Sequence, residues 1–96
     1  MRLHWTPQAL SDVADVLGYI ADEDPQAAAQ FQSRLFELLE DNLINQPTMG
    51  RPGRVSGTRE LLVHRHYILA YRLRGEAIEL LAFRHSARLW PDGFQE

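Results

Sequence analysis

The chain has 96 residues, a formal net charge of −3 and no cysteine. This length suits a single domain over residues 1–96, and the missing cysteine excludes disulfides, thiol catalysis and Cys-type zinc sites. No apolar run is long enough to span a bilayer, and the N-terminus shows no apolar stretch followed by a small-residue cleavage site. We therefore expect a cytoplasmic protein that does not bind membranes.

The charges are unevenly distributed along the chain. Residues 1–50 carry two arginines against eight acidic residues, whereas residues 51–96 carry eight arginines against five, and there is no lysine. A GC-rich genome would explain the use of arginine in place of lysine, but not the clustering. Because the planar guanidinium binds carboxylates and phosphates through paired hydrogen bonds, the second half favours an anionic or acidic partner.

Two helices are predicted after a short candidate strand at residues 3–5. Thr6-Pro7 is typical of a helix start, since Thr caps free N–H groups and Pro fits the first helical position. An apolar stripe follows at spacings of three and four, formed by Leu10, Val13, Leu17 and Ile20. It predicts a helix over about residues 7–22. Asp24-Pro25 repeats the start signal and predicts a second helix to about residue 45, so that residues 7–45 form a helical hairpin.

The periodicity then changes from helical to that of strands. Residues 46–57 hold three glycines and two prolines and predict a loop. The β-prone runs 58–63, 67–73 and 77–84 follow, with short links that favour antiparallel pairing. We expect an α+β domain, in which the N-terminal strand and the helical hairpin pack on an antiparallel sheet of three to four strands. Which set of alternating side chains in residues 67–73 faces solvent is left open by the sequence.

Four arginines, Arg59, Arg72, Arg84 and Arg88, come from different strands or from the C-terminal edge. If they converge, they form a cationic patch that could hold phosphates or an acidic peptide. The alternative is a set of solvated arginines with weak local pairs. Trp90 could pack as a lid on the domain or belong to a contact surface.

Some residues could take part in proton transfer or metal binding. His85, near Arg84 and Arg88, could act as a general acid–base in RNA cleavage, or be a structural histidine. Glu60 could act as a base, or pair with an arginine across the strands.

His64-x-His66 lacks a third ligand and favours a polar turn, so we expect no metal and no cofactor. Asp12 and Asp15 are expected on a solvated helix face.

Several of these stretches carry a family likeness. The run Gly-Arg-Pro-Gly-Arg-Val-Ser-Gly-Thr-Arg-Glu-Leu at residues 50–61 resembles the loop-to-strand segment of toxins of the ParE/RelE superfamily, and residues 67–72 resemble their central strand. Residues 85–91, His-Ser-Ala-Arg-Leu-Trp-Pro, look like the ending of one ParE-like branch. The helix openings at residues 5–10 and 24–28 are also similar. The likeness covers nearly the whole chain in order.

The resemblance implies the toxin half of a type II toxin–antitoxin system, linked to growth arrest and plasmid stabilization. It also implies a helical hairpin packed on an antiparallel sheet, without cofactor. The expected partner is a cognate antitoxin whose flexible C-terminal part wraps the toxin, and the two proteins could assemble into a larger complex.

Two activities occur in the superfamily. ParE-like members bind and block DNA gyrase, whereas RelE-like members cut mRNA on the ribosome without a metal. RelE-like nucleases carry an Arg directly after the central-strand Tyr, where this chain has Ile68 after Tyr67. This departure favours a gyrase poison that is not an enzyme.

For the gyrase poison, the candidates for binding the target or the antitoxin are Arg59, Arg72, Arg84, Arg88 and Trp90. The alternative is a ribosome-dependent endoribonuclease, in which the nuclease candidates are Arg59, Glu60, Arg72, His85 and Arg88. A third hypothesis is a module that only binds its antitoxin.

Overall fold

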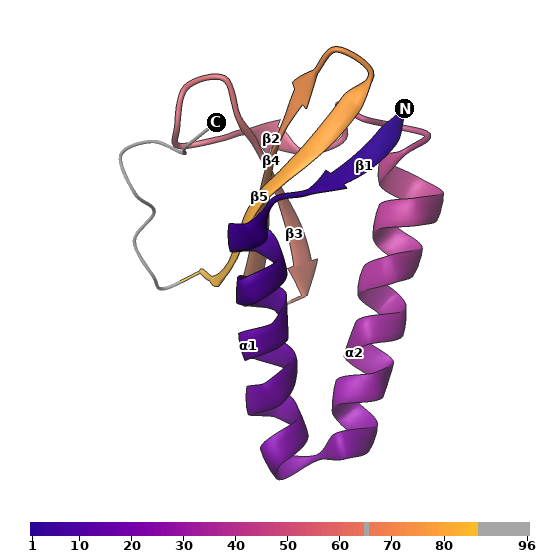
Figure 1. Cartoon of the computed structure of the whole chain (residues 1–96), viewed down its shortest axis with the longest axis vertical. Coiled ribbons are helices and arrows are strands. Elements are labelled where there is room, and N and C mark those ends of the chain that lie inside the picture. Colours follow the sequence, from indigo (N-terminus) through magenta and orange to yellow (C-terminus); the bar gives the residue numbers. More distant parts are fainter. Residues whose placement is uncertain (65, 87–96) are drawn as a thin grey trace.

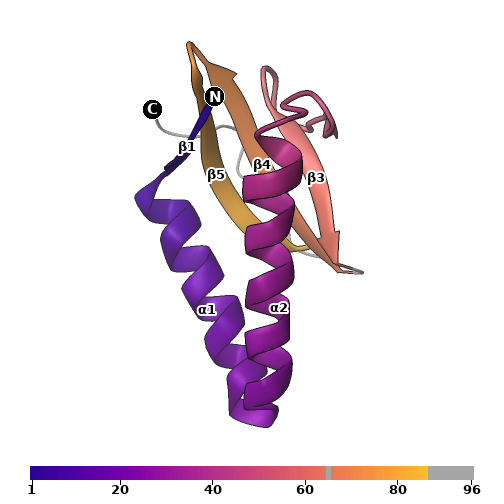
Figure 2. The same ribbon diagram turned by 90° about the vertical axis from the view of Figure 1, so that its right-hand side faces the viewer.

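The structure, a computed structural model, describes residues 1–64 and 66–86. In chain order the elements are β1 (Arg2–Trp5), α1 (Pro7–Glu23), α2 (Pro25–Glu37), the π-helical segment η1 (Leu38–Leu43), β2 (Arg51–Pro52), β3 (Arg59–His64), β4 (Tyr67–Arg74) and β5 (Ala77–His85). Both helices lie on one side of a five-stranded sheet, and the tip of their hairpin reaches past its end (Figures 1 and 2). In the described part of the chain, no helix is both long and apolar enough to cross a bilayer.

The predicted α+β architecture is confirmed, with a sheet in the order β1-β5-β4-β3-β2. The fifth strand is β2, two residues of the expected loop that pair with Arg59 and Glu60. β1 runs parallel to β5, from Arg2 beside Ala77 to Trp5 beside Leu80, whereas the other pairs are antiparallel. Parallel strands need a long crossover connection, and the chain between β1 and β5 contains the helical hairpin.

Both helix starts follow from their capping residues. The Thr6 hydroxyl accepts a hydrogen bond from the Ala9 N–H at 3.2 Å and donates one to the Leu80 carbonyl at 2.7 Å. It therefore caps α1 and ties the helix to β5. The Asp24 carboxylate accepts from the N–H groups of Gln26 and Ala27, both at 3.1 Å, and caps α2.

The buried side of α1 differs from the predicted stripe at one position. Leu10 is 55% exposed, whereas Ala9 and Val13 are buried in the core. In the first turn of α1, Ala9 therefore takes the core position that the predicted stripe gave to Leu10. Leu17 and Ile20 are partly buried against the core, as the stripe predicted.

The second helix ends in a wider turn. The Ile44 N–H donates to the Leu39 carbonyl five residues earlier, at 3.2 Å, which is the π-helical pattern of η1. Leu35, Leu39 and Leu43 stay fully buried along this stretch. The predicted end near residue 45 therefore matches α2 and η1 together.

The helices cover the sheet face that carries Tyr67, Leu69 and Tyr71 of β4. The opposite set, with Ala70 and Arg72, lies on the other face, where Ala70, Leu81 and Ala82 form a separate small cluster. Because neighbours along a strand alternate between faces, the burial of Leu69 and Tyr71 under the helices also assigns the other side chains of β4 to their face. An irregularity opposite Ala70 and Tyr71 leaves Leu81 without a partner on β4.

Candidate functional site

Arginines gather on the sheet face turned away from the helices. On β1, Leu3 and Trp5 pack against the helix-side core, so Arg2 and His4 turn to the opposite face. The register continues that face across the sheet, from Arg2 through Ala77 to Arg74, from His4 through Glu79 to Arg72, and from Glu60 to Arg51. We call this surface the arginine face, formed by Arg2, His4, Arg51, Arg54, Arg72 and Arg74.

Glu79 is one of two carboxylates that organise the arginine face. The Arg72 Nε lies 2.6 Å from Glu79 Oε1 and the Arg74 Nε lies 3.5 Å from it. The hydrogen bond from Arg72 holds the pKa of Glu79 below its ordinary value, against a smaller opposing effect of burial. Arg72 is thus present on the predicted surface, but its guanidinium is already paired.

Glu60 is the second carboxylate, and only 3% of its side chain is exposed. It accepts a hydrogen bond from the backbone N–H of Arg54 at 2.8 Å and lies 3.5 Å from the Arg51 guanidinium. Arg51 is its direct neighbour across β2 and β3. This geometry matches the cross-strand pairing considered for Glu60 and leaves little of its carboxylate accessible to a substrate.

Arg59 is separated from the other predicted arginines. It lies opposite Tyr71 in the register and therefore on the helix side of the sheet. Its guanidinium donates to the carbonyls of Gly50 at 2.8 Å and Thr48 at 3.2 Å. The expected convergence of Arg59 with Arg72 is therefore not found, because the two alternate across the plane of the sheet.

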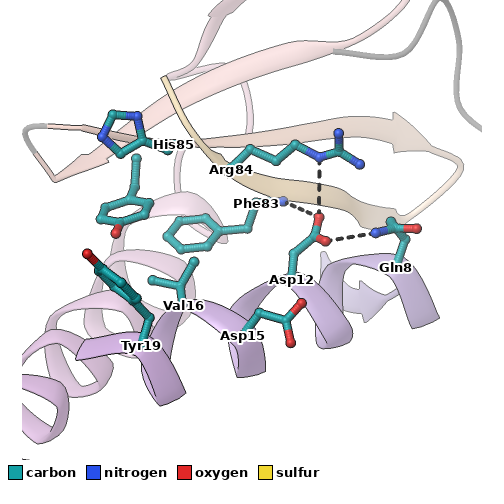
Figure 3. A pocket seen from close by; sticks show the side chains of 9 residues that line it. Gln8, Asp12, Asp15, Val16, Tyr19, Phe83, Arg84 and His85 are labelled. Carbon is teal, nitrogen blue, oxygen red and sulfur yellow. Dashed lines mark hydrogen bonds and ion pairs between the residues drawn. The ribbon is translucent and has the colours of Figure 1, made fainter. Parts of the chain in front are cut away.

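Arg84 and His85 lie in a second place, a groove between α1 and the end of β5 (Figure 3). The Asp12 carboxylate accepts from the Phe83 N–H at 3.0 Å and from the Gln8 side chain at 2.7 Å. Its second contact with β5 is the Arg84 Nε, at 3.8 Å. Asp12 is thus a clamp between α1 and β5 and not part of the solvated face that the sequence predicted.

The groove has a volume of about 730 Å³ and is lined by Gln8, Asp12, Asp15, Val16, Tyr19, Tyr67, Phe83, Arg84 and His85. Tyr67 stacks on Phe83 with the ring centroids 5.5 Å apart. The His85 ring meets Tyr67 edge-on at 5.6 Å and stacks on His66 at 5.3 Å. Aromatic rings therefore form much of its lining, next to the Asp12–Arg84 pair.

The two histidines of the expected polar turn, His64 and His66, have different ring partners. His64 lies against Phe31, with centroids 5.8 Å apart, whereas His66 stacks on His85. Within residues 1–64 and 66–86, no three His, Asp or Glu side chains are arranged to hold a metal ion. Arg88 and Trp90, the remaining predicted candidates, lie outside the described residues.

Comparison with known proteins places this geometry in a family. Residues 3–90 match the family model of the ParE toxin of the type II toxin–antitoxin system parDE. The chain belongs to the ParE toxin family. It is 38% identical to the protein Y4kP of Sinorhizobium fredii over 91 residues, which cover 94% of this chain and 93% of the relative.

Two further comparisons match most of this chain. The chain is 33% identical to Toxin RelE2 of Caulobacter vibrioides over 85 residues, covering 88% of this chain and 94% of that one. Its structure resembles the chromosomal ParDE system from P. aeruginosa with a TM-score of 0.75 at 26% identity, covering 88% of this chain and 95% of that one. Membership of this toxin family implies a cognate antitoxin as partner.

Sequence reasoning missed two sets of residues in this ParE-family chain. The first set is four residues of the arginine face that the sequence did not single out: Arg2, Arg51, Arg54 and Arg74. The excess of arginine after residue 50 was a signal for three of them. Tyr19 was not selected either. Its signal was an aromatic side chain four residues after Asp15, off the apolar stripe of α1.

Proposed function

We propose that this toxin inhibits growth in the cytoplasm by binding DNA gyrase and blocking it, and that it catalyses no reaction itself. The observation that carries the proposal is the separation of the groups that an RNA-cleaving site would need to bring together. A general acid–base and the cations that stabilise a phosphorane must lie within a few ångströms of one phosphate.

Among the described residues, the nuclease candidates Arg59, Glu60, Arg72 and His85 do not converge on one point. Arg72 pairs with Glu79, whereas His85 pairs with Tyr67 at the other end of β4 and β5. Five to six residues of strand separate the two positions, which corresponds to roughly 17–20 Å. Arg59 lies on the opposite face and Glu60 is buried against Arg51. The geometry supports a binding surface over a catalytic centre.

The arginine face is the surface that we assign to the target. Guanidinium groups arranged across a sheet suit contact with a carboxylate-rich protein surface, and the carboxylates of buried Glu60 and half-buried Glu79 orient several of them. Arg51 keeps 67% of its side chain exposed despite its contact with Glu60, so it remains accessible to a partner.

The test is a DNA supercoiling assay with purified gyrase and purified toxin. We expect supercoiling to fall with added toxin and to recover when the cognate antitoxin is added in equimolar amount. Full gyrase activity at a large excess of toxin would refute the proposal for that enzyme.

The second candidate function is a ribosome-dependent mRNA endoribonuclease, favoured by the exposed His85 beside Arg84 in the groove. If this function holds, primer extension on mRNA after toxin induction shows cuts positioned by codon, and His85→Gln removes them. Growth arrest without such cuts rejects it. Induction that leaves growth unchanged would instead support a module that only binds its antitoxin.

A further inference from the structure

The groove between α1 and β5 contains two carboxylates, of Asp12 and Asp15, and only that of Asp12 is bonded to neighbouring residues of the described chain. Both oxygens of Asp12 are engaged, with Gln8, Phe83 and Arg84. Asp15, one turn further along α1, is exposed, and among the described residues the structure gives its carboxylate no partner. Figure 3 shows its side chain on the wall of the groove without an interaction to its neighbours.

Next to this carboxylate is an exposed aromatic ring. Tyr19 follows Asp15 by four residues, which places both on one side of α1. Tyr19 is 68% exposed and lines the groove, so its ring is accessible to a partner. Opposite it, Tyr67 stacked on Phe83 provides an apolar wall.

These features suit a long cationic side chain. Arg or Lys can pair with the Asp15 carboxylate, place its charge on the face of Tyr19, and pack its methylene groups against Val16 and Tyr67. An anionic group would gain little here, because the Arg84 side chain already pairs with Asp12. The volume of about 730 Å³ also leaves room for an apolar residue beside the cation.

We propose that this groove takes an arginine or lysine of the cognate antitoxin, flanked by an apolar residue, with Asp15 and Tyr19 as the residues that determine specificity. The inference rests on the proposed function, because it takes this chain to be the toxin of a pair. The arginine face offers positive charge to the target, whereas the groove offers a negative charge to a basic segment. The two surfaces can therefore serve different partners.

The first experiment measures the Kd of the toxin for its cognate antitoxin by isothermal titration calorimetry. Asp15→Asn is expected to weaken binding about tenfold, and Tyr19→Ala about fivefold to tenfold, with a reduced dependence on salt for Asp15→Asn. The matched controls on the same helix are Asp22→Asn and Leu10→Ala, which alter exposed residues outside the groove lining and should change Kd less than twofold.

Urea denaturation checks that all four variants remain folded. Wild-type affinity for both groove variants, or equal losses in the groove variants and their controls, would overturn the proposal.

The second experiment separates the groove from the target surface. In the supercoiling assay, Asp15→Asn should inhibit gyrase at the same concentration as the wild type but need more antitoxin for release. If Asp15→Asn no longer inhibits gyrase but keeps its affinity for the antitoxin, the groove contacts the target, and the proposal is refuted. If even the wild type leaves gyrase active, the proposed target is wrong, while the calorimetry still decides the role of the groove.

Discussion

The hydroxyl of Tyr71 joins the loop after η1 to the centre of the sheet. It accepts a hydrogen bond from the Gly50 N–H at 2.9 Å and donates one to the Pro47 carbonyl at 2.8 Å. Burial raises the pKa of Tyr71, more than the Gly50 hydrogen bond and the nearby charge of Arg59 lower it. The side chain therefore stays protonated and able to donate across the physiological pH range.

Tyr71→Phe should destabilise the protein by about 1–3 kcal/mol, because the buried Gly50 N–H and the Pro47 carbonyl lose their partner without any gain in packing. Urea denaturation at pH 7 measures the change in free energy of unfolding. Tyr19→Phe is the control, since its hydroxyl belongs to an exposed side chain, and it should stay within about 0.5 kcal/mol of the wild type. Equal stability of both variants would contradict the role given to the Tyr71 hydroxyl.

The Arg72–Glu79 pair predicts a pH dependence. The pKa of Glu79 is lower in the folded protein than its ordinary value of 4.5, so its contribution to stability is present above that value and is lost as the pH falls through the folded pKa. The stability gap between the wild type and Arg72→Gln should be about 1–2 kcal/mol at pH 7 and shrink below pH 4.5.

Urea unfolding from pH 7 down to pH 3 measures this gap. Arg74→Gln should show a smaller change, because the Arg74 Nε is 3.5 Å from Glu79 and its side chain is more exposed. If the difference in unfolding free energy between the wild type and Arg72→Gln does not change with pH, the loss of the Arg72–Glu79 ion pair is not its cause.

At the scale of elements, replacing two glycines by alanine is expected to have opposite effects on stability. Gly18 lies within α1, and a Cβ at this position would have no neighbour within 4 Å, so Gly18→Ala should stabilise the protein by roughly 0.5–1 kcal/mol. At Gly50, a Cβ would meet the Tyr71 Oη at 2.7 Å and the Glu60 carbonyl at 2.9 Å. Gly50→Ala should therefore cost about 1–3 kcal/mol. Thermal unfolding of both variants is the measurement, and a shift of the same sign in both would contradict these contacts.

Elements specified by neighbouring residues were predictable, and those specified by distant pairing were not. Thr6-Pro7 and Asp24-Pro25 mark both helix starts because capping is a contact within one turn. The parallel pairing of β1 with β5 joins residues more than seventy positions apart, and no local signal carries it. β2 was missed because two residues, one of them proline, look like part of a loop.

The same reasoning applies to the candidate site. His85 and Arg84 were found from residue type and position, and they do share the groove. The placement of Arg59 depends on register, since a shift of one residue would move it to the other face. The clamp formed by Asp12 needed the approach of α1 to β5, which periodicity does not reveal.

For the molecule as a whole, opposite charges are presented by the helical half and the strand half. If the arginine face contacts the target, the double variant Arg51→Gln/Arg74→Gln should need about ten times more toxin for half-inhibition of gyrase, because two lost contacts of roughly 0.7 kcal/mol each amount to one power of ten. Arg34→Gln, on the exposed side of α2, is the matched control and should inhibit like the wild type. The supercoiling assay with a toxin titration measures both. Equal potency of the double variant and the control would remove the arginine face from the interaction with gyrase.

The clamp between α1 and β5 has a consequence for solubility. β1 ends beside Leu80, so the outer backbone of β5 beyond that point has no neighbouring strand within the described residues. There the Asp12 carboxylate takes up the Phe83 N–H, which would otherwise be open to an extended segment of another molecule. An inward-pointing charged side chain at a sheet margin protects against pairing with a strand of another molecule. A toxin that is not bound to its antitoxin would thus be less prone to self-associate through this margin.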